Sequence, residues 1–246
     1  MSIKKKYVCS ACGAVYYQPA GRCWKCHKFG TVKEVVENNE APAVSEKASK
    51  RVSRVTTGEK PIAINKISNQ DTENRLITGI GEFDRVLGGG IVPGSVLLLA
   101  GNPGAGKSSL LGSVAEKIAE QGKKVYYISG EENPTQIATR HKRIHAMNEN
   151  IIVLSETNLD KSLEYVKQDK PDFIILDSIQ TVVTGNSEGR QGSPSQVMEV
   201  ASTLTTLAKT TNTPIMIIGH VTKDSNIAGP RTLEHLVDVV IYLDAS

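Results

Sequence analysis

The sequence predicts an α/β fold, with a mostly parallel sheet covered by helices on both faces and a small four-cysteine module before it. From Arg75 onward, short apolar runs alternate with helical patterns, which is typical of parallel strands joined by helices. Residues 34–74 are polar and lack a helical apolar stripe, so we expect a largely flexible linker. All four cysteines precede that linker. The predicted domains are residues 1–33, 34–74 and 75–246.

Six apolar runs are the candidate strands of the sheet. Each is short and rich in Val, Ile and Leu, as expected for strands buried on both faces. The runs are residues 95–101, 123–129, 151–154, 173–177, 214–219 and 239–244. None is as long as a membrane span, and the N-terminus MSIKKKYVCS lacks the apolar run of a secretory signal. We therefore expect a cytoplasmic protein without a membrane partner.

Charge is distributed unevenly along the chain. The formal net charge is +3, but residues 1–33 contain seven of the 29 Lys and Arg residues and none of the 26 Asp and Glu residues. The first segment therefore carries +7 and the remainder −4. A basic segment of this kind indicates contact with nucleic acid or with an acidic partner protein.

A glycine-rich loop follows the first apolar run. Residues 101–109 read GNPGAGKSS and lie between a strand pattern and a helix pattern. They match the phosphate-binding loop G-x-x-x-x-G-K-[ST], in which backbone N–H groups surround phosphates at a helix N-terminus. Lys107 would reach the β- and γ-phosphates of ATP, and Ser108 would bind Mg²⁺. An ordinary glycine-rich turn is the alternative, but the strand-to-helix context favours nucleotide binding. The candidate ATP-binding residues are Gly101, Asn102, Pro103, Gly104, Ala105, Gly106, Lys107, Ser108 and Ser109.

Three carboxylates follow other apolar runs. Asp177 ends the run 173–177 and is the candidate magnesium-supporting residue, with a helix cap as the alternative. Glu131 and Glu132 lie just past the run 123–129, at the sheet edge where ligands bind in such folds. Either could orient and deprotonate water, although adjacent carboxylates on a loop are usually only solvated charges. The two cannot be ranked from the sequence.

The cysteines form two C-x-x-C pairs, Cys9 with Cys12 and Cys23 with Cys26, separated by ten residues. Each pair can present two thiolates to a tetrahedral Zn²⁺. The spacer is shorter than in most zinc ribbons and predicts a compact knuckle. Because His27 follows Cys26, the stretch CWKCH also fits c-type haem attachment, which would leave the other pair unexplained. We expect the aromatic residues of this segment to form its small core rather than a base-stacking platform. They are Tyr7, Tyr16, Tyr17, Trp24 and Phe29.

Several stretches resemble the RadA (Sms) family of bacterial DNA-repair ATPases. These stretches are LGGGIVPGSVLLLAGNPGAGKSS, YYISGEE, FIILDSIQTV and IMIIGHVTKDSNIAGPRTLEHLVD. The RecA-like core is shared with recombinases and circadian clock ATPases, whereas the cysteine module together with HVTKD and IAGPR is close to specific for RadA. The resemblance covers Tyr7 to about Asp244. It implies a DNA-dependent ATPase that forms homo-oligomeric rings on single-stranded DNA and assists branch migration of branched recombination intermediates, with a recombinase as a further candidate partner.

The resemblance also implies roles for individual residues. Residues 101–109 match the phosphate loop and Asp177 the magnesium aspartate, while Glu131 and Glu132 match the catalytic glutamate position. His220 matches the polar residue that senses the γ-phosphate. Two loops, 184–196 and 222–231, correspond to those that line the hole of the ring. Neither contains an aromatic residue, so we expect mainly electrostatic DNA contacts. The candidate DNA-binding residues are Arg190, Gln191, Ser195, Lys223 and Arg231.

RadA proteins continue beyond this core into a Lys-Asn-Arg-Phe-Gly motif and a domain that resembles the Lon protease, and the present sequence contains neither. We therefore expect slow ATP hydrolysis and poor ring assembly from these 246 residues. A nucleotide-dependent protein-binding switch, similar to the clock ATPases, is the alternative function. The phosphate loop and the two glutamates fit that alternative equally well, whereas the cysteine module and IAGPR do not.

Overall fold

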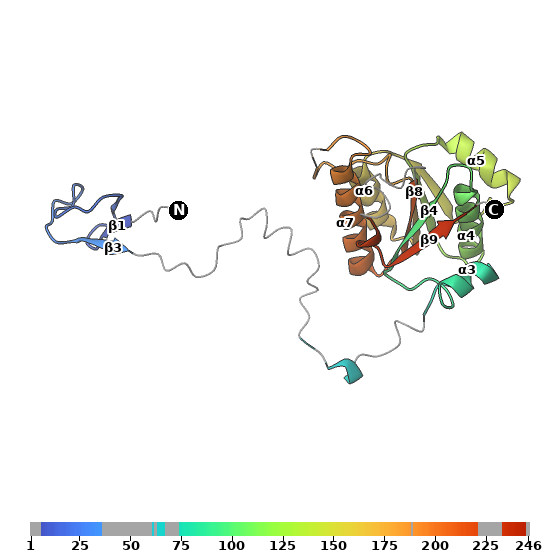
Figure 1. The fold of residues 1–246 in the computed structure, drawn as a ribbon, viewed down its shortest axis with the longest axis horizontal. Helices are drawn as coiled ribbons and strands as arrows, with labels where there is room; N and C mark the ends of the chain where they lie inside the picture. Colours follow the sequence, from blue (N-terminus) through green and yellow to red (C-terminus); the bar gives the residue numbers. More distant parts are fainter. Residues whose placement is uncertain are drawn as a thin grey trace. The chain divides into compact units, whose positions relative to one another are not determined.

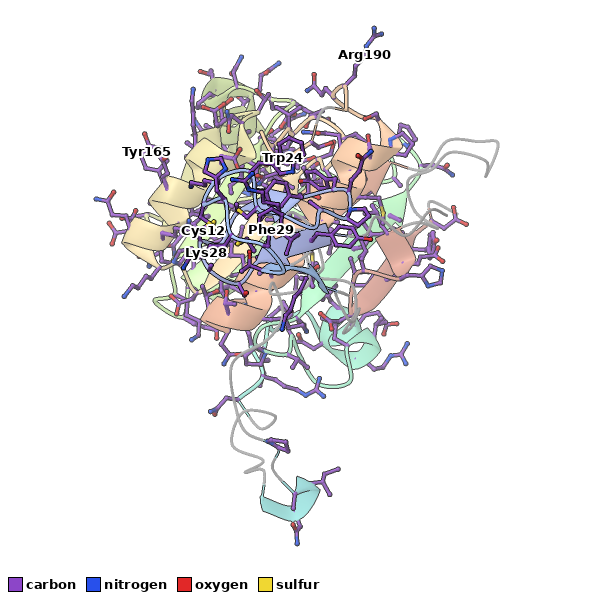
Figure 2. The ribbon with its side chains drawn as sticks, turned by 90° about the vertical axis from the view of Figure 1, so that its left-hand side faces the viewer. Cys12, Trp24, Lys28, Phe29, Tyr165 and Arg190 are labelled. Atoms are coloured by element: carbon purple, nitrogen blue, oxygen red, sulfur yellow. The ribbon has the colours of Figure 1, made fainter. Side chains whose placement is uncertain are left out.

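The computed structural model describes residues 6–35, 61, 63–66, 74–187, 189–220 and 233–244. The chain divides into two compact units, Met1–Ser53 and Arg54–Ser246, and each is described by itself. Most of the predicted linker lies outside the described residues; a short 3-10 helix, η1 (Ile64–Lys66), lies within it. In Figure 2, Cys12, Trp24, Lys28 and Phe29 belong to the first unit and Tyr165 and Arg190 to the second.

The first unit is a small antiparallel sheet with the strand order β2-β1-β3. Its strands are β1 (Lys6–Cys9), β2 (Val15–Tyr16) and β3 (Val32–Val35). Each C-x-x-C pair closes a tight turn, in which the Gly13 N–H donates to Cys9 O and the His27 N–H donates to Cys23 O. Gly13 and His27 both adopt a left-handed backbone, with φ of 70° and 60°. The two turns therefore repeat one geometry.

The second unit contains a six-stranded sheet in which every neighbouring pair is parallel (Figure 1). In spatial order its strands are β6 (Ile151–Ser155), β5 (Val125–Ser129), β7 (Phe173–Asp177), β8 (Ile215–His220), β4 (Val96–Gly101) and β9 (Val239–Leu243). The predicted α/β class with a parallel sheet is confirmed. No helix within the described ranges is long and apolar enough to span a membrane.

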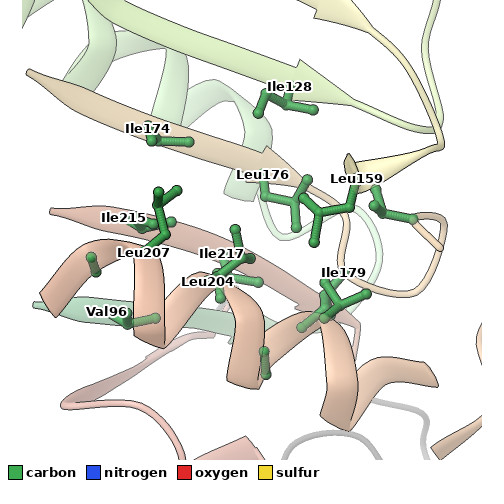
Figure 3. Packing of buried hydrophobic residues seen from close by; sticks show 14 of the residues in the cluster. Val96, Ile128, Leu159, Ile174, Leu176, Ile179, Leu204, Leu207, Ile215 and Ile217 are labelled. Atoms are coloured by element: carbon green, nitrogen blue, oxygen red, sulfur yellow. The ribbon is translucent and has the colours of Figure 1, made fainter. Parts of the chain in front are cut away.

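Helices cover both faces of this sheet. On one face pack α3 (Gly81–Val86), α4 (Lys107–Ala119) and α5 (Pro134–Arg143), and on the other α6 (Leu159–Asp169) and α7 (Pro194–Thr211). Alternate residues of each strand enter the two cores: in β4, Leu98 packs on the side of α7 and Leu99 on the side of α4. Figure 3 shows the core beneath α7, where Leu204 and Leu207 face the strands. Burial on both faces explains why the four inner strands are continuous apolar runs, whereas the edge strands β6 and β9 each expose one large side chain, Ile152 and Tyr242.

The carboxyl ends of the parallel strands meet at one edge of the sheet. In the strand register Gly101 lies opposite His220, and Ser129 lies opposite Asp177. The glycine-rich loop, the Glu131–Glu132 pair and Asp177 therefore emerge at this edge, which is where open α/β sheets bind ligands.

Candidate functional site

Two glycines determine the path of the loop 101–109. A Cβ on Gly101 would lie 2.3 Å from the carbonyl oxygen of Leu243, so β9 passes too close for any side chain there. Gly106 is the N-cap of α4 and has a φ of 88°, which favours glycine. Because Gly106 carries no side chain, it cannot cap the first N–H groups of α4. Those groups and the helix dipole suit an anion such as phosphate.

Lys107 is buried at the start of α4, with 5% of its surface exposed. Its Nζ donates hydrogen bonds to Gly101 O and Asn102 O, both at 2.9 Å. Burial lowers the pKa of Lys107, and the negative charges of Asp177 and Glu131 partly oppose that shift. The ammonium group is therefore held on the loop's own carbonyls, within the field of two carboxylates. An incoming phosphate could replace the carbonyls as its partner.

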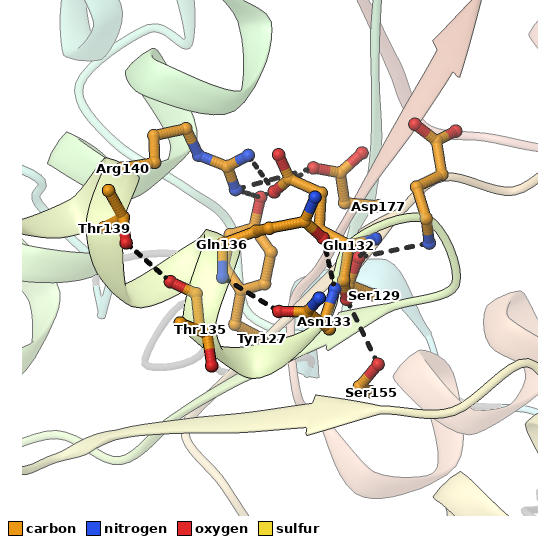
Figure 4. Close-up of polar contacts among 11 residues, drawn as sticks. Tyr127, Ser129, Glu132, Asn133, Thr135, Gln136, Thr139, Arg140, Ser155 and Asp177 are labelled. Carbon is orange, nitrogen blue, oxygen red and sulfur yellow. Dashed lines mark hydrogen bonds and ion pairs between the residues drawn. The ribbon is translucent and has the colours of Figure 1, made fainter.

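Asp177 is buried at the end of β7 and belongs to a polar network (Figure 4). Its Oδ2 accepts a hydrogen bond of 2.7 Å from Tyr127 Oη. Arg140 Nη2 lies 3.9 Å from the same oxygen and donates to Tyr127 Oη at 2.9 Å. Tyr127 thus donates the hydrogen bond that holds this carboxylate oxygen, and Arg140 supports both groups through its charge and its hydrogen bond to Tyr127.

The two glutamates have different surroundings. Glu131 Oε1 accepts a hydrogen bond from Ser178 Oγ, and Ser178 directly follows Asp177. The negative charge of Glu131 also acts on Lys107. Glu132 Oε2 instead forms an ion pair and hydrogen bond with Arg140 Nη1. The charge of Glu131 therefore acts on the phosphate-loop lysine, whereas the charge of Glu132 is paired with Arg140 on α5. This difference separates two residues that are equivalent in the sequence.

Sequence reasoning missed Arg140 and Tyr127. Asn133 and Gln136 form a reciprocal capping box at the start of α5, which fixes the direction of the helix (Figure 4). Arg140 follows two turns later and reaches back to Glu132 and Tyr127. A basic residue eight positions after a glutamate pair is a weak sequence signal, because exposed helical arginines are common.

Arg140→Met is expected to destabilise the larger unit by about 2 kcal/mol, because it leaves Glu132 and Asp177 without their cationic partner while keeping side-chain length. Urea unfolding followed by circular dichroism measures the change. Arg143→Met, which alters an exposed arginine of the same helix, is the matched control. Equal unfolding midpoints for both variants would contradict the network.

The other predicted site residues are His220 and the five candidate DNA-binding residues. His220 ends β8 beside Gly101, and its side chain lies outside the described residues. Arg190 is exposed and projects from the fold (Figure 2). Gln191 and Ser195 are also exposed, and Gln191 Nε2 donates to Thr181 O. Lys223 and Arg231 lie outside the described residues.

The four cysteine sulfurs of the first unit lie within 4.8 Å of one another. The Sγ atoms of Cys9 and Cys26 are 3.7 Å apart, and those of Cys12 and Cys23 are 3.5 Å apart. A tetrahedron with metal–sulfur bonds of about 2.3 Å has sulfurs about 3.8 Å apart, whereas a disulfide bond is about 2.05 Å long. The spacing fits a tetrathiolate metal site, which either zinc or iron could occupy.

A hydrogen bond from a neighbouring tyrosine supports this cluster. Tyr16 Oη lies 3.2 Å from Cys23 Sγ, and its hydrogen bond lowers the pKa of that thiol to about 5. A thiolate is the form that binds metal. Among the described residues, the four cysteines form the one group suited to a metal ion, and His27 is not part of it. The exposed His27 instead fills the left-handed turn position that Gly13 fills in the first pair.

The expectation that the aromatic residues form a small core is wrong for three of the five. Tyr17, Trp24 and Phe29 are 71%, 76% and 75% exposed, whereas Tyr7 and Tyr16 are half-buried. A metal held by four residues can order a short chain without a large apolar core, so hydrophobicity does not predict burial here.

Comparison with known proteins identifies both units. A family model described as an AAA domain matches residues 66–226, which is more than half of the chain. The chain belongs to the AAA domain family. The matched range contains the phosphate loop, Glu131, Glu132 and Asp177, so the core is a P-loop ATPase domain. A second model, described as a rubredoxin metal binding domain, matches residues 7–34 and includes all four cysteines.

Three curated relatives, each described as DNA repair protein RadA, are similar along almost all of the chain. The protein from Listeria monocytogenes is 42% identical over 239 residues, covering 97% of this chain and 51% of its own length. The Aquifex aeolicus protein is 41% identical over 241 residues, covering 98% of this chain and 52% of its own length. The Synechocystis protein is 40% identical over 261 residues, covering 97% of this chain and 52% of its own length. The chain spans about half the length of these relatives. The resemblance to RadA is confirmed.

Proposed function

We propose that the chain hydrolyses ATP in response to single-stranded DNA, as part of a RadA-type role in DNA repair. The observation that carries the proposal is the meeting of Lys107, Glu131 and Asp177 at the carboxyl edge of one parallel sheet, beside an uncapped helix N-terminus. These are the groups that phosphoryl transfer to water requires: a phosphate cradle, a cation, a magnesium ligand and a base.

In this proposal the loop 101–109 binds the phosphates of ATP. Lys107 exchanges its two loop carbonyls for β- and γ-phosphate oxygens, so its charge is available without a large rearrangement. Ser108 and Asp177 would hold Mg²⁺, which when bound neutralises charge on the phosphates. Tyr127 and Arg140 keep the Asp177 carboxylate in one orientation.

Glu131 is the proposed general base. It orients a water molecule whose oxygen attacks the γ-phosphorus, and the bond to the bridging β–γ oxygen breaks as ADP leaves. The proton released by the water passes to the Glu131 carboxylate. The Ser178 hydroxyl stabilises the ionised carboxylate before the reaction. Glu132 has a positioning role through Arg140, and His220 is the proposed γ-phosphate sensor.

Two observations support DNA as the partner: the relatives are DNA repair proteins, and two loops have the composition expected for phosphate contacts. Arg190 and Gln191 are exposed on the first loop, and Ser195 is exposed in the first turn of α7. These three residues would follow the phosphate backbone, as would Lys223 and Arg231 on the second predicted loop. Five expectations stay predictions: branched DNA as a substrate, a recombinase as a partner, ring assembly, the rate of turnover and a cytoplasmic location.

Steady-state ATP turnover with and without oligo-dT tests this function. We expect single-stranded DNA to accelerate turnover and Lys107→Ala to abolish it. Arg190→Gln should reduce the acceleration, while the matched Arg143→Gln on α5 should not. Turnover that is measurable but indifferent to DNA would favour the nucleotide-dependent protein switch instead.

A further inference from the structure

We propose that the N-terminal metal unit is itself a contact for single-stranded nucleic acid, on which bases stack against exposed rings. The stacking platform consists of Tyr17, Trp24 and Phe29, with the cations Arg22, Lys25 and Lys28 between them in the sequence. This inference rests on the proposed DNA partner and adds a second binding surface, on a different unit from the ATPase site.

The first argument is the exposure of the three rings. Tyr17, Trp24 and Phe29 each leave more than 70% of their surface in water, although the unit has few other large apolar side chains. None of the three is a metal ligand. Three exposed rings in one small unit indicate a binding surface.

The second argument is how the rings are held together. Tyr17 and Trp24 line one open groove of about 910 Å³, together with Arg22 and His27. The Arg22 guanidinium lies over the Phe29 ring, 5.1 Å from its centre, and the two residues form a β-bridge. Arg22 therefore joins Phe29 to the wall of the groove. Figure 2 shows Trp24, Lys28 and Phe29, which come from the second cysteine turn and the bridge beside it.

The third argument connects the platform to the metal cluster. The Trp24 N–H donates a hydrogen bond of 3.1 Å to Tyr16 Oη, and the same hydroxyl contacts Cys23 Sγ. The cysteine cluster thus fixes the backbone that carries Trp24. A pre-ordered ring loses less conformational freedom when a base stacks on it.

Charge selects the kind of partner. Residues 1–33 carry +7, and a divalent metal with four thiolates reduces this to about +5. Arg22, Lys25 and Lys28 are exposed next to the rings. An acidic protein would match the charge, but alternating rings and cations match a strand that offers phosphates and unstacked bases together. Duplex DNA, whose bases are already stacked, fits less well.

Trp24 is the only tryptophan of the chain, so its fluorescence reports on the platform directly. The zinc-loaded full chain is titrated with oligo-dT in the absence of nucleotide, with anisotropy of labelled oligo-dT measured in parallel. We expect quenching of Trp24 emission and about a tenfold loss of affinity in Trp24→Ala. Tyr165→Ala, which removes a 53% exposed ring from α6, should bind as tightly as the unchanged chain. Zinc content confirms that each variant retains its cluster.

Three results would contradict the proposed stacking platform. Binding by anisotropy without a change in Trp24 emission would place the DNA elsewhere, and so would equal affinity losses in Trp24→Ala and Tyr165→Ala. Quenching by poly-glutamate as strong as that by oligo-dT would identify an acidic protein as the partner. None of these results contradicts DNA-stimulated ATP turnover, which is measured separately, so failure of the platform and failure of the proposed function are distinguishable.

Discussion

Glu131→Gln is expected to lower the rate constant of ATP hydrolysis by about two to four orders of magnitude and to leave ATP affinity within about twofold. Glutamine keeps the size of the side chain and can still accept a hydrogen bond from Ser178, but it cannot take a proton from water. Single-turnover hydrolysis and calorimetric ATP binding, measured on the same preparation, separate the chemical step from binding.

Glu132→Gln is the matched control, because it changes the neighbouring carboxylate in the same way. It weakens the contact with Arg140 and should lower the rate constant by less than about tenfold. Lys107→Ala should lose ATP affinity itself, since it removes the cation aimed at the phosphates. If Glu131→Gln loses affinity as completely as Lys107→Ala, the carboxylate is structural. If Glu132→Gln shows the larger rate loss, the roles are reversed.

Cys23→Ser is expected to abolish stable metal binding and to unfold residues 6–35. Cys23 is fully buried and supplies one of the four clustered sulfurs, and binding of a structural metal supplies on the order of 10 kcal/mol to the folding of so small a unit. Metal analysis should find one zinc per chain in the unchanged protein and much less in the variant, and hydrogen exchange should show loss of protection in β1 and β3.

His27→Gly is the control for the cysteine variant. Glycine adopts the left-handed backbone of this position readily, so the variant should keep its zinc and its hydrogen-exchange protection. Loss of metal from His27→Gly would mean that the imidazole is a ligand. Iron in place of zinc, or bound haem, in freshly prepared protein would contradict the prediction that this site binds zinc.

Much of the ATPase core could be predicted from the sequence because its signals are local. The inner strands are buried on both faces, so they are apolar runs, and the phosphate loop requires glycines at positions such as Gly101 and Gly106. The roles of Glu131 and Glu132 could not be separated in this way. Their difference depends on Ser178, which lies 47 residues after Glu131, and on Arg140, whose direction is fixed only by the fold of the next helix.

In the metal unit, the metal ligands could be predicted from the spacing of the cysteines. The exposure of its aromatic rings could not be predicted. A large aromatic side chain normally indicates a core, and that expectation holds where apolar contacts provide the stability. Here the four sulfurs organise the chain, so Trp24 and Phe29 remain in water.

The structure of the chain with Mg²⁺ and a non-hydrolysable ATP analogue tests the central claim most directly. The account predicts that the phosphates lie on residues 101–109, with Lys107 Nζ moved from Gly101 O and Asn102 O to phosphate oxygens. Ser108 and Asp177 should flank the magnesium ion, and Glu131, not Glu132, should face the γ-phosphate. An analogue seated in the groove of about 750 Å³ at the opposite edge of the sheet, beside Lys123, would contradict the account. So would a bound nucleotide that leaves both carbonyl contacts of Lys107 in place.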